Sequence, residues 1–517
     1  MSKLADNKNQ IIFGNNFISI RDIVEIAYQN KEAELSQDTG WRKKIQKGAE
    51  FLSRLLKEEG SIYGVTTGYG DSCTVAVPID LVYELPLHLS RFHGCGMGNT
   101  LSVELSLAVL AVRLSSLSQG YSGVRLEILE TLAQLINKKI APVIPEEGSV
   151  GASGDLTPLS YVAAVLMGER EVFYKGKREE TLSVFNKEGI TPLKLVPKEG
   201  LALMNGTAVM TAMACAAYDR AEYLCRLASR ITALTIIATD GNPCHFKENL
   251  FTVKPHMGQV KVAEFIRNDL YELPPSKEKN RLQDRYSLRC APHVIGVLVD
   301  SLDWMKKFIE TEINSANDNP IIDGEKEEIL HGGHFYGGHI AFVMDSMKNA
   351  VANLADLMDR QLALLVDPKF NHGLPANLTA AKGKRASINH GFKAVQILVS
   401  ALCAEALKLT MPASVFSRST ECHNQDKVSM GTIAARDCLR IIELTEQIAA
   451  AMLLAVIQGI DLRLETANDL NLKKHILNMK DSIREKFELV IEDRPMESSL
   501  RYFVELIRKK EWNLYNE

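Results

Sequence analysis

Gly148-Ser149-Val150-Gly151-Ala152-Ser153-Gly154-Asp155-Leu156-Thr157 places the tripeptide Ala-Ser-Gly between flexible glycines. In a tight bend, the amide nitrogen of Gly154 can attack the carbonyl carbon of Ala152. Loss of two waters, one from the Ser153 side chain, then leaves a five-membered ring with an exocyclic methylidene. Gly154 has no Cβ to block the approach of its nitrogen, and Ala152 is small. The run therefore predicts an electrophile made without an added cofactor. The alternative interpretation is a flexible turn followed by an Asp or Ser helix cap.

Five other segments share a family pattern with this run. They are Ser61-Ile62-Tyr63-Gly64-Val65-Thr66-Thr67-Gly68-Tyr69-Gly70, Gly200-Leu201-Ala202-Leu203-Met204-Asn205-Gly206-Thr207, Gln283-Asp284-Arg285-Tyr286-Ser287-Leu288-Arg289-Cys290, Asn314-Ser315-Ala316-Asn317-Asp318-Asn319-Pro320 and Asn424-Gln425-Asp426-Lys427-Val428-Ser429-Met430-Gly431. In this order, the chain from about residue 60 to about residue 465 resembles the aromatic amino acid ammonia-lyases and aminomutases. That family builds 4-methylidene-imidazol-5-one (MIO) from Ala-Ser-Gly, and the motifs are most similar to those of the tyrosine and phenylalanine ammonia-lyases.

Composition excludes several classes of partner. The 517 residues are 46% hydrophobic and 24% charged with a formal net charge of -4, so the chain can bury a large core and lacks the basic excess of a nucleic-acid binder. The nine cysteines form no CxxC pair, and the polar start Met1–Lys8 is unlike a signal peptide. We therefore expect reduced thiols and a cytoplasmic protein. The most apolar run, 448–457, is too short to span a bilayer and indicates the middle of a buried helix.

Hydrophobic periodicity predicts a mainly α fold. Residues 101–117 have apolar side chains at helical spacing and contain neither Gly nor Pro, so they predict a buried helix that ends near Gly120. Similar patterns occupy residues 203–239, 290–315, 340–366, 389–409 and 431–466. Helices this apolar need one another as neighbours, which favours a bundle of long central helices. The alternating segment Glu171–Lys177 predicts a small hairpin.

The family resemblance implies further features that composition and spacing do not. It implies a loop-rich N-terminal domain with the MIO group, residues 1–200, followed by the helix bundle, residues 201–517. It also implies a homotetramer whose active sites draw on three subunits. The implied reaction is elimination of ammonia from an aromatic L-amino acid to give an α,β-unsaturated acid. MIO formed from Ala152-Ser153-Gly154 is its prosthetic group, and neither a metal nor a diffusible cofactor is expected.

Tyr63 is the predicted base of this reaction. The β-proton of the substrate is weakly acidic, so an electrophile on the amino group does not remove the need for a base. A tyrosine hydroxyl has an ordinary pKa of about 10, so we expect positive or hydrogen-bonding neighbours to depress it. The alternative interpretation is a loop tyrosine that packs its ring against apolar neighbours.

Five residues are predicted around the electrophile and the substrate. The Arg289 guanidinium can bind both oxygens of a substrate carboxylate, and helical spacing would bring Gln283 and Tyr286 to the same side. By the resemblance, Tyr286 and Asn205 donate hydrogen bonds around the MIO ring, while Phe335 packs against the ring or the substrate. The alternatives are a surface arginine, a turn asparagine and a core phenylalanine.

Substrate preference rests on two segments. In Glu421-Cys422-His423-Asn424-Gln425-Asp426, Gln425 stands where histidine enzymes of the family have Glu, and the resemblance puts Glu421 near the substrate amine. The selectivity pair is Phe92-His93, a hybrid of the pairs in phenylalanine, tyrosine and histidine enzymes. Because a neutral imidazole can hydrogen-bond a phenol, we expect tyrosine first, with phenylalanine second and histidine third.

Several departures from the family pattern leave other readings open. Thr66, Tyr69 and His334 replace the usual Asn, Phe and Asn. The segment Tyr63–Gly70 also resembles that of a tyrosine 2,3-aminomutase, an enzyme that re-adds the ammonia at the β-carbon. His331, His334 and His339 fit no common zinc spacing, so no metal site is predicted. An inactive relative that serves as a scaffold or binding protein is the remaining alternative.

Overall fold

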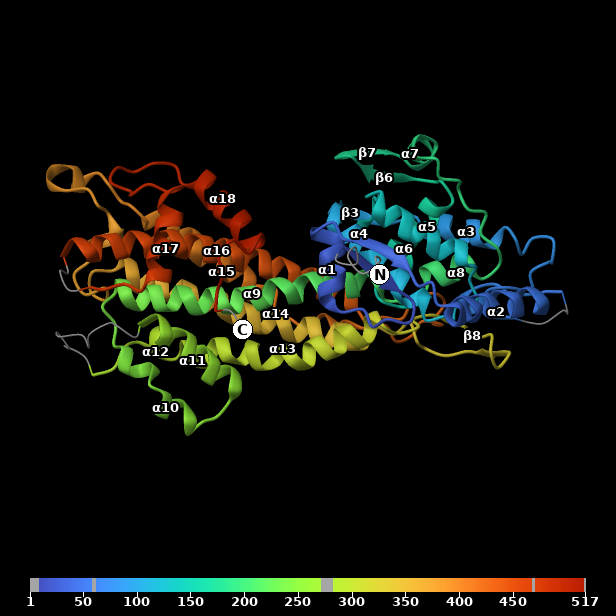
Figure 1. The fold of residues 1–517 in the computed structure, drawn as a ribbon, viewed down its shortest axis with the longest axis horizontal. Coiled ribbons are helices and arrows are strands. Elements are labelled where there is room, and N and C mark those ends of the chain that lie inside the picture. Colours follow the sequence, from blue (N-terminus) through green and yellow to red (C-terminus); the bar gives the residue numbers. More distant parts are fainter. Residues whose placement is uncertain (1–8, 58–61, 271–281, 467–469, 516–517) are drawn as a thin grey trace, which may run out of the picture. The chain divides into compact units, whose positions relative to one another are not determined.

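The computed structural model of the chain describes residues 9–57, 62–270, 282–466 and 470–515. This part is mainly helical with a few short strands, which confirms the mainly α fold class (Figure 1). The polar start Met1–Lys8 and Ser61 of the first family segment lie outside the described residues.

The chain divides into two compact units, each discontinuous in sequence. Unit 1 comprises Met1–Asp219, Met305–Asp345 and Pro412–Arg436, and unit 2 comprises Arg220–Trp304, Ser346–Met411 and Asp437–Glu517. Four of the five boundaries fall inside long helices, so several stretches of chain contribute to each unit. The domains expected at residues 1–200 and 201–517 stay a prediction.

Unit 1 contains the shorter helices of the first half of the chain. They are α1 (Ile20–Tyr28), α2 (Thr39–Leu55), α3 (Leu85–Phe92), α4 (Val103–Ser118), α5 (Leu126–Asn137), α6 (Leu156–Leu166), α7 (Thr181–Glu188) and α8 (Glu199–Met204). The α4 helix is the one predicted at residues 101–117: Ser102 caps it by accepting from the Leu105 N–H (3.2 Å). All its residues from Ser106 onward are buried, and it packs between α1 and α5.

Four small sheets complete the described part of unit 1. They pair β1 (Gln10–Phe13) with β2 (Glu32–Leu35), β3 (Met97–Thr100) with β5 (Pro145–Glu147), β4 (Ala141–Pro142) with β6 (Glu171–Tyr174) and β7 (Lys177–Glu180), and β8 (Ile321–Asp323) with β9 (Glu328–Leu330). The β1/β2 pair is parallel and the others are antiparallel. Strands β6 and β7 form the predicted hairpin, with Val172 opposite Glu179.

The long helices correspond to the predicted apolar patterns. They are α9 (Ala208–Ala238), α13 (Ala291–Ile313), α14 (Gly338–Val366), α15 (Lys393–Lys408) and α16 (Gly431–Thr466). Unit 2 also holds α10 (Glu248–Thr252), α11 (Met257–Leu270), α12 (Tyr286–Arg289), α17 (Lys474–Arg484) and α18 (Glu497–Arg508). One correction applies to the helix expected from residue 203, because the turn at Asn205-Gly206 separates α8 from α9.

Close packing of α9, α14 and α16 forms the core of unit 2 (Figure 1). Gly459 of α16 lets Ala238 of α9 and Leu365 of α14 approach, since an added Cβ would lie 3.2 Å from side-chain atoms of both. In the described part of the chain, α16 is the one helix long and apolar enough to cross a membrane, and 89% of its most apolar stretch is buried. Each residue of the predicted segment 448–457 is fully buried, which confirms a core helix there.

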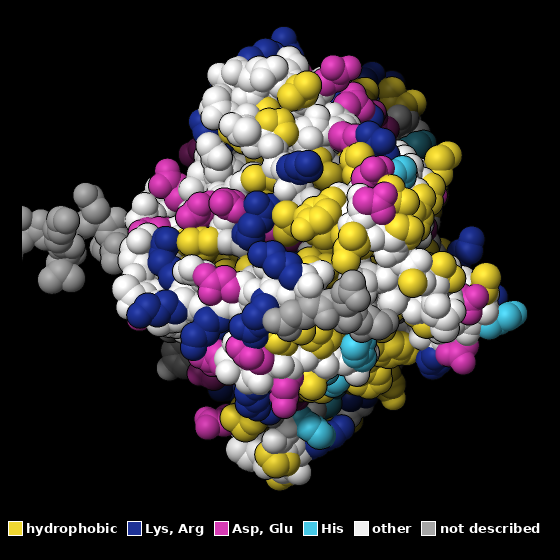
Figure 2. All heavy atoms as spheres, turned by 90° about the vertical axis from the view of Figure 1, so that its right-hand side faces the viewer, with side chains coloured by type: hydrophobic (Ala, Val, Ile, Leu, Met, Phe, Trp, Pro, Cys, Tyr) yellow, Lys and Arg dark blue, Asp and Glu magenta, His cyan; other side chains and the backbone are white. Residues whose placement is uncertain are grey.

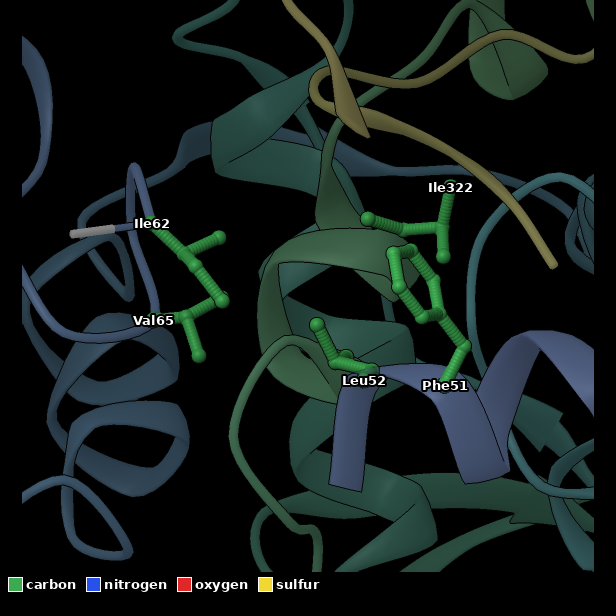
Figure 3. Packing of buried hydrophobic residues seen from close by; sticks show 5 residues of the cluster. All are labelled: Phe51, Leu52, Ile62, Val65 and Ile322. Carbon is green, nitrogen blue, oxygen red and sulfur yellow. The ribbon is translucent and has the colours of Figure 1, made fainter. Parts of the chain in front are cut away.

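A hydrophobic cluster supports the segment that leads to Tyr63. Phe51 and Leu52 of α2, Ile322 of β8, and Ile62 and Val65 are all buried and pack together (Figure 3). On the surface seen in Figure 2, basic and acidic side chains intermix with hydrophobic ones.

Candidate active site

Hydrogen bonds anchor the Ala152-Ser153-Gly154 turn on both sides. Before it, the Gly151 carbonyl accepts from the Ser429 N–H and from the Ser429 hydroxyl, each at 3.1 Å. After it, the Asp155 N–H donates to the Gly206 carbonyl at 2.7 Å. The turn is therefore fixed to two segments that lie far from it in sequence.

Gly154 occupies a position that admits only glycine. Its φ is +72°, and an added Cβ would overlap the backbone carbonyl of Gly206. Gly154 and Gly206 form an isolated parallel bridge, in which the Gly206 N–H donates to the Ser153 carbonyl (3.3 Å). Because the bridge uses the Ser153 carbonyl and the Asp155 N–H, it leaves the Gly154 N–H out. The nitrogen required for ring closure is thus not committed to this bridge.

Asp155 stabilises the start of α9 and not of its own helix. Its side chain makes no capping bond in α6, but its carboxylate accepts from the N–H groups of Val209 (3.0 Å) and Met210 (2.9 Å). Hydroxyls of Ser149 (3.0 Å) and Thr432 also donate to it. An anion at a helix N-terminus is favourable, and four donors offset its full burial. Burial nevertheless raises the pKa of Asp155 above its ordinary value.

Buried charges hold the Asn205-Gly206 turn in place. Arg113, whose side chain is fully buried, donates to the carbonyls of Asn317 (3.1 Å) and Ala202. Desolvation lowers its pKa to about 10, and Asp318 opposes that shift. Asp318 also forms a fully buried ion pair with Lys198 (2.7 Å). Removal of either partner would leave an uncompensated charge in the core.

Asn205 provides an orphaned polar atom next to the Ala-Ser-Gly turn. The residue is 3% exposed and ends α8, while its neighbour Gly206 pairs with Gly154. Among the described residues, its Oδ1 has no hydrogen-bond partner. Most buried polar atoms in folded proteins have a hydrogen-bond partner, so this amide is a candidate contact for a group at the turn.

Tyr63 lies in a turn, and its hydroxyl accepts a hydrogen bond from the Gly70 N–H at 2.8 Å. Its ring meets the His331 imidazole edge-on, with the ring centroids 6.5 Å apart. Burial raises the pKa of Tyr63, and the Gly70 N–H opposes this shift without cancelling it. Glu421 and Cys73 raise the pKa further. The expectation that its neighbours depress the pKa of Tyr63 is therefore wrong, because desolvation outweighs the one N–H donor.

A left-handed turn joins the predicted residues Glu421 and Gln425. Glu421, Cys422 and His423 have φ values of +51°, +52° and +65°. Thr420 closes the turn, because its backbone pairs with that of Gln425 and its hydroxyl donates to Gln425 Oε1 (2.9 Å). Three consecutive residues in this sparsely populated region store strain, which is typical of functional sites.

This turn contacts both predicted catalytic elements. The Glu421 carboxylate accepts from the Asp71 N–H at 2.9 and 3.1 Å, next to the Gly70 that bonds Tyr63. Gln425 Nε2 donates to the Ser153 hydroxyl at 3.4 Å. Tyr63, Ser153, Glu421 and Gln425 are thus brought together within unit 1. The carboxylate of Glu421, expected at the substrate amine, is bound to backbone here.

The pair Phe92-His93 ends helix α3. Phe92 is 59% exposed, and its ring lies tilted against that of His93, with centroids 4.2 Å apart. His93 Nδ1 lies 3.0 Å from the Leu89 carbonyl, so this nitrogen carries the proton and donates. Burial lowers the pKa of His93 and outweighs the hydrogen bond to the Leu89 carbonyl, which raises it, while Arg170 lowers the pKa further. The ring is therefore neutral near pH 7, with an acceptor lone pair at Nε2.

Phe335 lies in a loop that precedes α14. It is half-buried, and its neighbour Tyr336 donates to the Val428 carbonyl at 3.5 Å. The same loop contains His334, one of the departures from the family pattern, next to Gly332. His331, at the start of the loop, is the residue that contacts Tyr63.

Gln283, Tyr286 and Arg289 belong to unit 2 and are described apart from the residues above. Tyr286 is 72% exposed, and the Arg289 guanidinium lies 4.6 Å from its ring centroid. Arg289 Nε donates to the Asp284 carbonyl at 3.0 Å. The helix begins only at Tyr286, since Arg285 has extended backbone, so the expected helical alignment of Gln283 with these residues is wrong.

In the described part of the chain, the residues compact enough to hold a metal ion are Asp356, Asp359 and Cys403 in unit 2. Arg360 forms ion pairs with both carboxylates, at 3.1 and 3.5 Å, and Ser400 donates to Asp359 (2.7 Å). Arg360 and Ser400 therefore already bind the carboxylates of this cluster.

The sequence interpretation missed the residues that support the site from a distance. Asp155 was considered only as a cap of its own helix in the alternative interpretation, and Arg113, Lys198, Thr420 and Thr432 were not singled out. Charged residues inside apolar runs, such as Arg113 within residues 103–118, were the available signal, because a charge at such a position is buried and must have partners.

Comparison with known proteins places this geometry in a family. The profile of the aromatic amino acid lyases matches residues 18–485. A histidine ammonia-lyase of Alkaliphilus oremlandii (strain OhILAs) is 37% identical over 501 residues, 96% of each chain. The tyrosine aminomutase from Streptomyces globisporus has a similar fold, with a TM-score of 0.89, 32% identity and 97% of each chain covered. The histidine ammonia-lyase from Trypanosoma cruzi gives a TM-score of 0.87 at 30% identity, covering 97% of this chain and 94% of that one. The chain therefore belongs to the aromatic amino acid lyase family and is a carbon–nitrogen lyase.

Proposed function

We propose that this chain is an MIO-dependent ammonia-lyase of an aromatic L-amino acid, with MIO formed from its own Ala152-Ser153-Gly154. The observation that carries the proposal is the anchored turn, in which Gly154 admits no side chain and leaves its nitrogen out of the bridge to Gly206. The buried Asn205 also brings a side-chain amide beside that turn, where it can donate to a prosthetic group. Once formed, the group supplies an electrophile that turns the substrate amino group into a better leaving group.

The surrounding residues would hold this group and the developing charge. Gln425 is within hydrogen-bond reach of the Ser153 side chain, at 3.4 Å, and Asn205 lies beside Gly206. Amide N–H groups that are fixed before reaction stabilise negative charge without reorganisation. Tyr286 of another subunit is the proposed third donor.

Tyr63 is the proposed base, and its Oη would take the proton from the substrate β-carbon. Its hydrogen bond from the Gly70 N–H stabilises the phenolate, whereas burial and Glu421 oppose it. A raised pKa makes the phenolate scarcer at neutral pH but a stronger base when present. The rate should therefore rise with pH over the range in which Tyr63 loses its proton.

Arg289 is the proposed clamp for the substrate carboxylate, with Gln283 beside it in sequence. A guanidinium binds a carboxylate through two parallel hydrogen bonds and so fixes the position of the α-carbon. We propose a homotetramer in which Gln283, Tyr286 and Arg289 of one subunit contribute to a site of another; the 72% exposure of Tyr286 in the single chain is consistent with this role. No disulfide links the cysteines of the described part of the chain, which supports the proposed cytoplasmic location.

L-Histidine is the proposed first substrate, in place of the tyrosine preference expected from the sequence. Its support is the histidine ammonia-lyase with 37% identity over nearly the whole chain. A neutral His93 with an acceptor at Nε2 also fits an imidazole N–H.

L-Tyrosine is the second candidate, because the same acceptor fits a phenol and Gln425 replaces the Glu of histidine enzymes. The fold similarity to a tyrosine aminomutase also supports this candidate, and with it retention of ammonia for re-addition. Phe92 supplies an apolar wall for either ring.

One set of incubations tests these proposals. The purified protein is given L-histidine, L-tyrosine or L-phenylalanine separately, and the conjugated acid, ammonia and any β-amino acid are measured. Urocanate with stoichiometric ammonia supports the first candidate, and p-coumarate the second. A β-amino acid product instead supports aminomutase activity. An absence of product from all three contradicts the proposal and favours the inactive relative.

A further inference from the structure

Arg170 connects helix α6, which follows the Ala152-Ser153-Gly154 turn, with helix α3, which ends at Phe92-His93. Its Nη2 donates to the Ser90 carbonyl at 2.6 Å, and its Nη1 donates to the Ser160 hydroxyl at 3.1 Å. The guanidinium also lies 4.1 Å from the Tyr161 ring centroid, a favourable cation–π distance. Ser160 and Tyr161 belong to α6, which begins directly after the Ala-Ser-Gly turn, whereas Ser90 belongs to α3.

The same side chain fixes the segment around His93. Gly94 follows the selectivity pair, and an added Cβ there would overlap Arg170 Nη2, so the backbone packs directly against the guanidinium. The Gly96 N–H donates to the Tyr161 hydroxyl at 3.2 Å. Phe92-His93 is therefore anchored on both sides in sequence. Ser90, before the pair, binds Arg170, and the segment Gly94–Gly96, after it, packs against Arg170 and binds Tyr161 of α6.

Arg170 also bears on the charge state of His93. The imidazole donates from Nδ1 to the Leu89 carbonyl, which leaves Nε2 as the acceptor. Burial lowers the pKa of His93, and the Arg170 cation lowers it further. Arg91 and Glu169, two charged residues adjacent in sequence to Phe92 and Arg170, form an ion pair at 2.5 Å. Arg170 therefore acts on both the position and the protonation of this ring.

We propose that Arg170 is a positioning residue for substrate selectivity, which holds His93 at a fixed place relative to the Ala152-Ser153-Gly154 turn as a hydrogen-bond acceptor. The part of the site that binds the substrate ring, at Phe92-His93, then favours a ring with a hydrogen-bond donor, such as an imidazole N–H or a phenol O–H, over a phenyl ring. This inference rests on the proposed function and names a residue that acts through His93 without contacting the reacting atoms.

Two variants and one control test the inference. Arg170→Gln removes the positive charge and the planar guanidinium with its two hydrogen bonds. Arg170→Lys keeps a positive charge but loses one of the two hydrogen bonds and the stacking of the guanidinium on Tyr161. For both, we expect the ratio of kcat/KM on the better donor-ring substrate to kcat/KM on phenylalanine to fall about ten-fold, because the ring donor loses a well-placed partner. The near-ultraviolet absorbance of the electrophile should stay unchanged. Glu169→Gln, which breaks only a surface ion pair next in sequence, should leave the ratio unchanged.

Two readouts separate positioning from a general structural role. The pKa of His93, followed by NMR of ring-labelled histidine, should rise in Arg170→Gln and stay lower in Arg170→Lys. In a His93→Leu background, Arg170→Gln should cause little further loss of selectivity, since the pair acts as one unit. If Arg170→Gln does not fold, the same measurements are made on Arg170→Lys, alone and combined with His93→Leu in a double-mutant cycle.

The outcomes distinguish this inference from the proposed function. A selectivity ratio unchanged in the folded Arg170 variants, with the electrophile absorbance intact, would overturn the inference alone. Equal losses with and without His93 would also overturn it, because Arg170 would then act elsewhere. A wild-type protein with neither the absorbance nor turnover of any aromatic amino acid would remove both proposals.

Discussion

The Ala152-Ser153-Gly154 turn and the Tyr63 segment are both loops of unit 1, but hydrogen bonds hold them very differently. The first is bound to Ser429 and Gly206, and the buried Asp155 after it ties it to the start of α9. The Tyr63 segment is closed mainly by local bonds, such as those from the Val65 and Thr66 N–H groups to the Ile62 carbonyl and from the Gly70 N–H to the Tyr63 hydroxyl, while the Glu421 carboxylate accepts from the Asp71 N–H. Distant segments thus fix the electrophile turn, whereas the described hydrogen bonds of the base segment are mostly local.

Removal of the electrophile should give the largest effect. Ser153→Ala keeps the anchored backbone but lacks the hydroxyl that leaves, so kcat should fall by at least about three orders of magnitude with the fold retained. Steady-state kinetics, circular dichroism and near-ultraviolet difference absorbance check this. Ser183→Ala, on the exposed face of α7, is the matched control and should behave as wild type. Near-normal turnover by Ser153→Ala would contradict the assignment.

Loss of the Tyr63 hydroxyl should have the next largest effect. Tyr63→Phe should lower kcat by about 10²–10⁴-fold and change KM only a few-fold, because the hydroxyl acts as a base and not as a binder. Since the pKa of Tyr63 is raised, wild-type kcat/KM should climb on the alkaline side of neutrality, and the variant should lose this slope. Tyr83→Phe, an exposed tyrosine in the same unit, serves as control. An unchanged pH profile in Tyr63→Phe would move the base elsewhere, with Tyr286 the next candidate.

Substitution of His93, proposed to bind the substrate ring, should have a smaller effect on kcat/KM that depends on the substrate. His93→Leu removes the acceptor and leaves the donor of a histidine or tyrosine ring unpaired, which costs roughly 1–3 kcal/mol, or about ten- to a hundred-fold in kcat/KM relative to phenylalanine. Kinetics on all three amino acids measure this ratio. If the ratio did not move, His93 would not face the ring, and selectivity would rest on Gln425 and its neighbours.

The smallest expected effect concerns the contact between Glu421 and the base segment. Glu421→Gln keeps an acceptor for the Asp71 N–H but removes the negative charge that raises the pKa of Tyr63. The alkaline limb of the pH–rate profile should therefore move to lower pH, with a change of only a few-fold in kcat at neutral pH. An unmoved limb, or a shift to higher pH, would show that the carboxylate does not act on Tyr63.

The difference between these two regions also explains what the sequence could predict. Ring closure involves consecutive residues, so the chemistry of Ala152-Ser153-Gly154 can be predicted from the sequence alone. Long apolar patterns likewise predicted α13, α14 and α16, because amphipathic periodicity is local.

Properties that depend on tertiary burial were not predictable in this way. The direction of the Tyr63 pKa shift was wrong, since desolvation comes from the packing of distant segments. The backbone donors to Asp155, Val209 and Met210, lie more than fifty residues away on α9, so its role could not be inferred from the local motif. Gln283 was expected on a common helix face, but the extended backbone at Arg285 delays the helix to Tyr286.

The central claim is that the chain converts its own Ala152-Ser153-Gly154 into the electrophile, and an intact-mass measurement tests it most directly. The wild-type protein should be lighter than its sequence mass by two water molecules, with the deficit confined to the peptide that contains Gly148–Thr157. Ser153→Ala, which lacks the leaving hydroxyl, should not show this double loss. A wild-type protein at its full sequence mass would contradict the account.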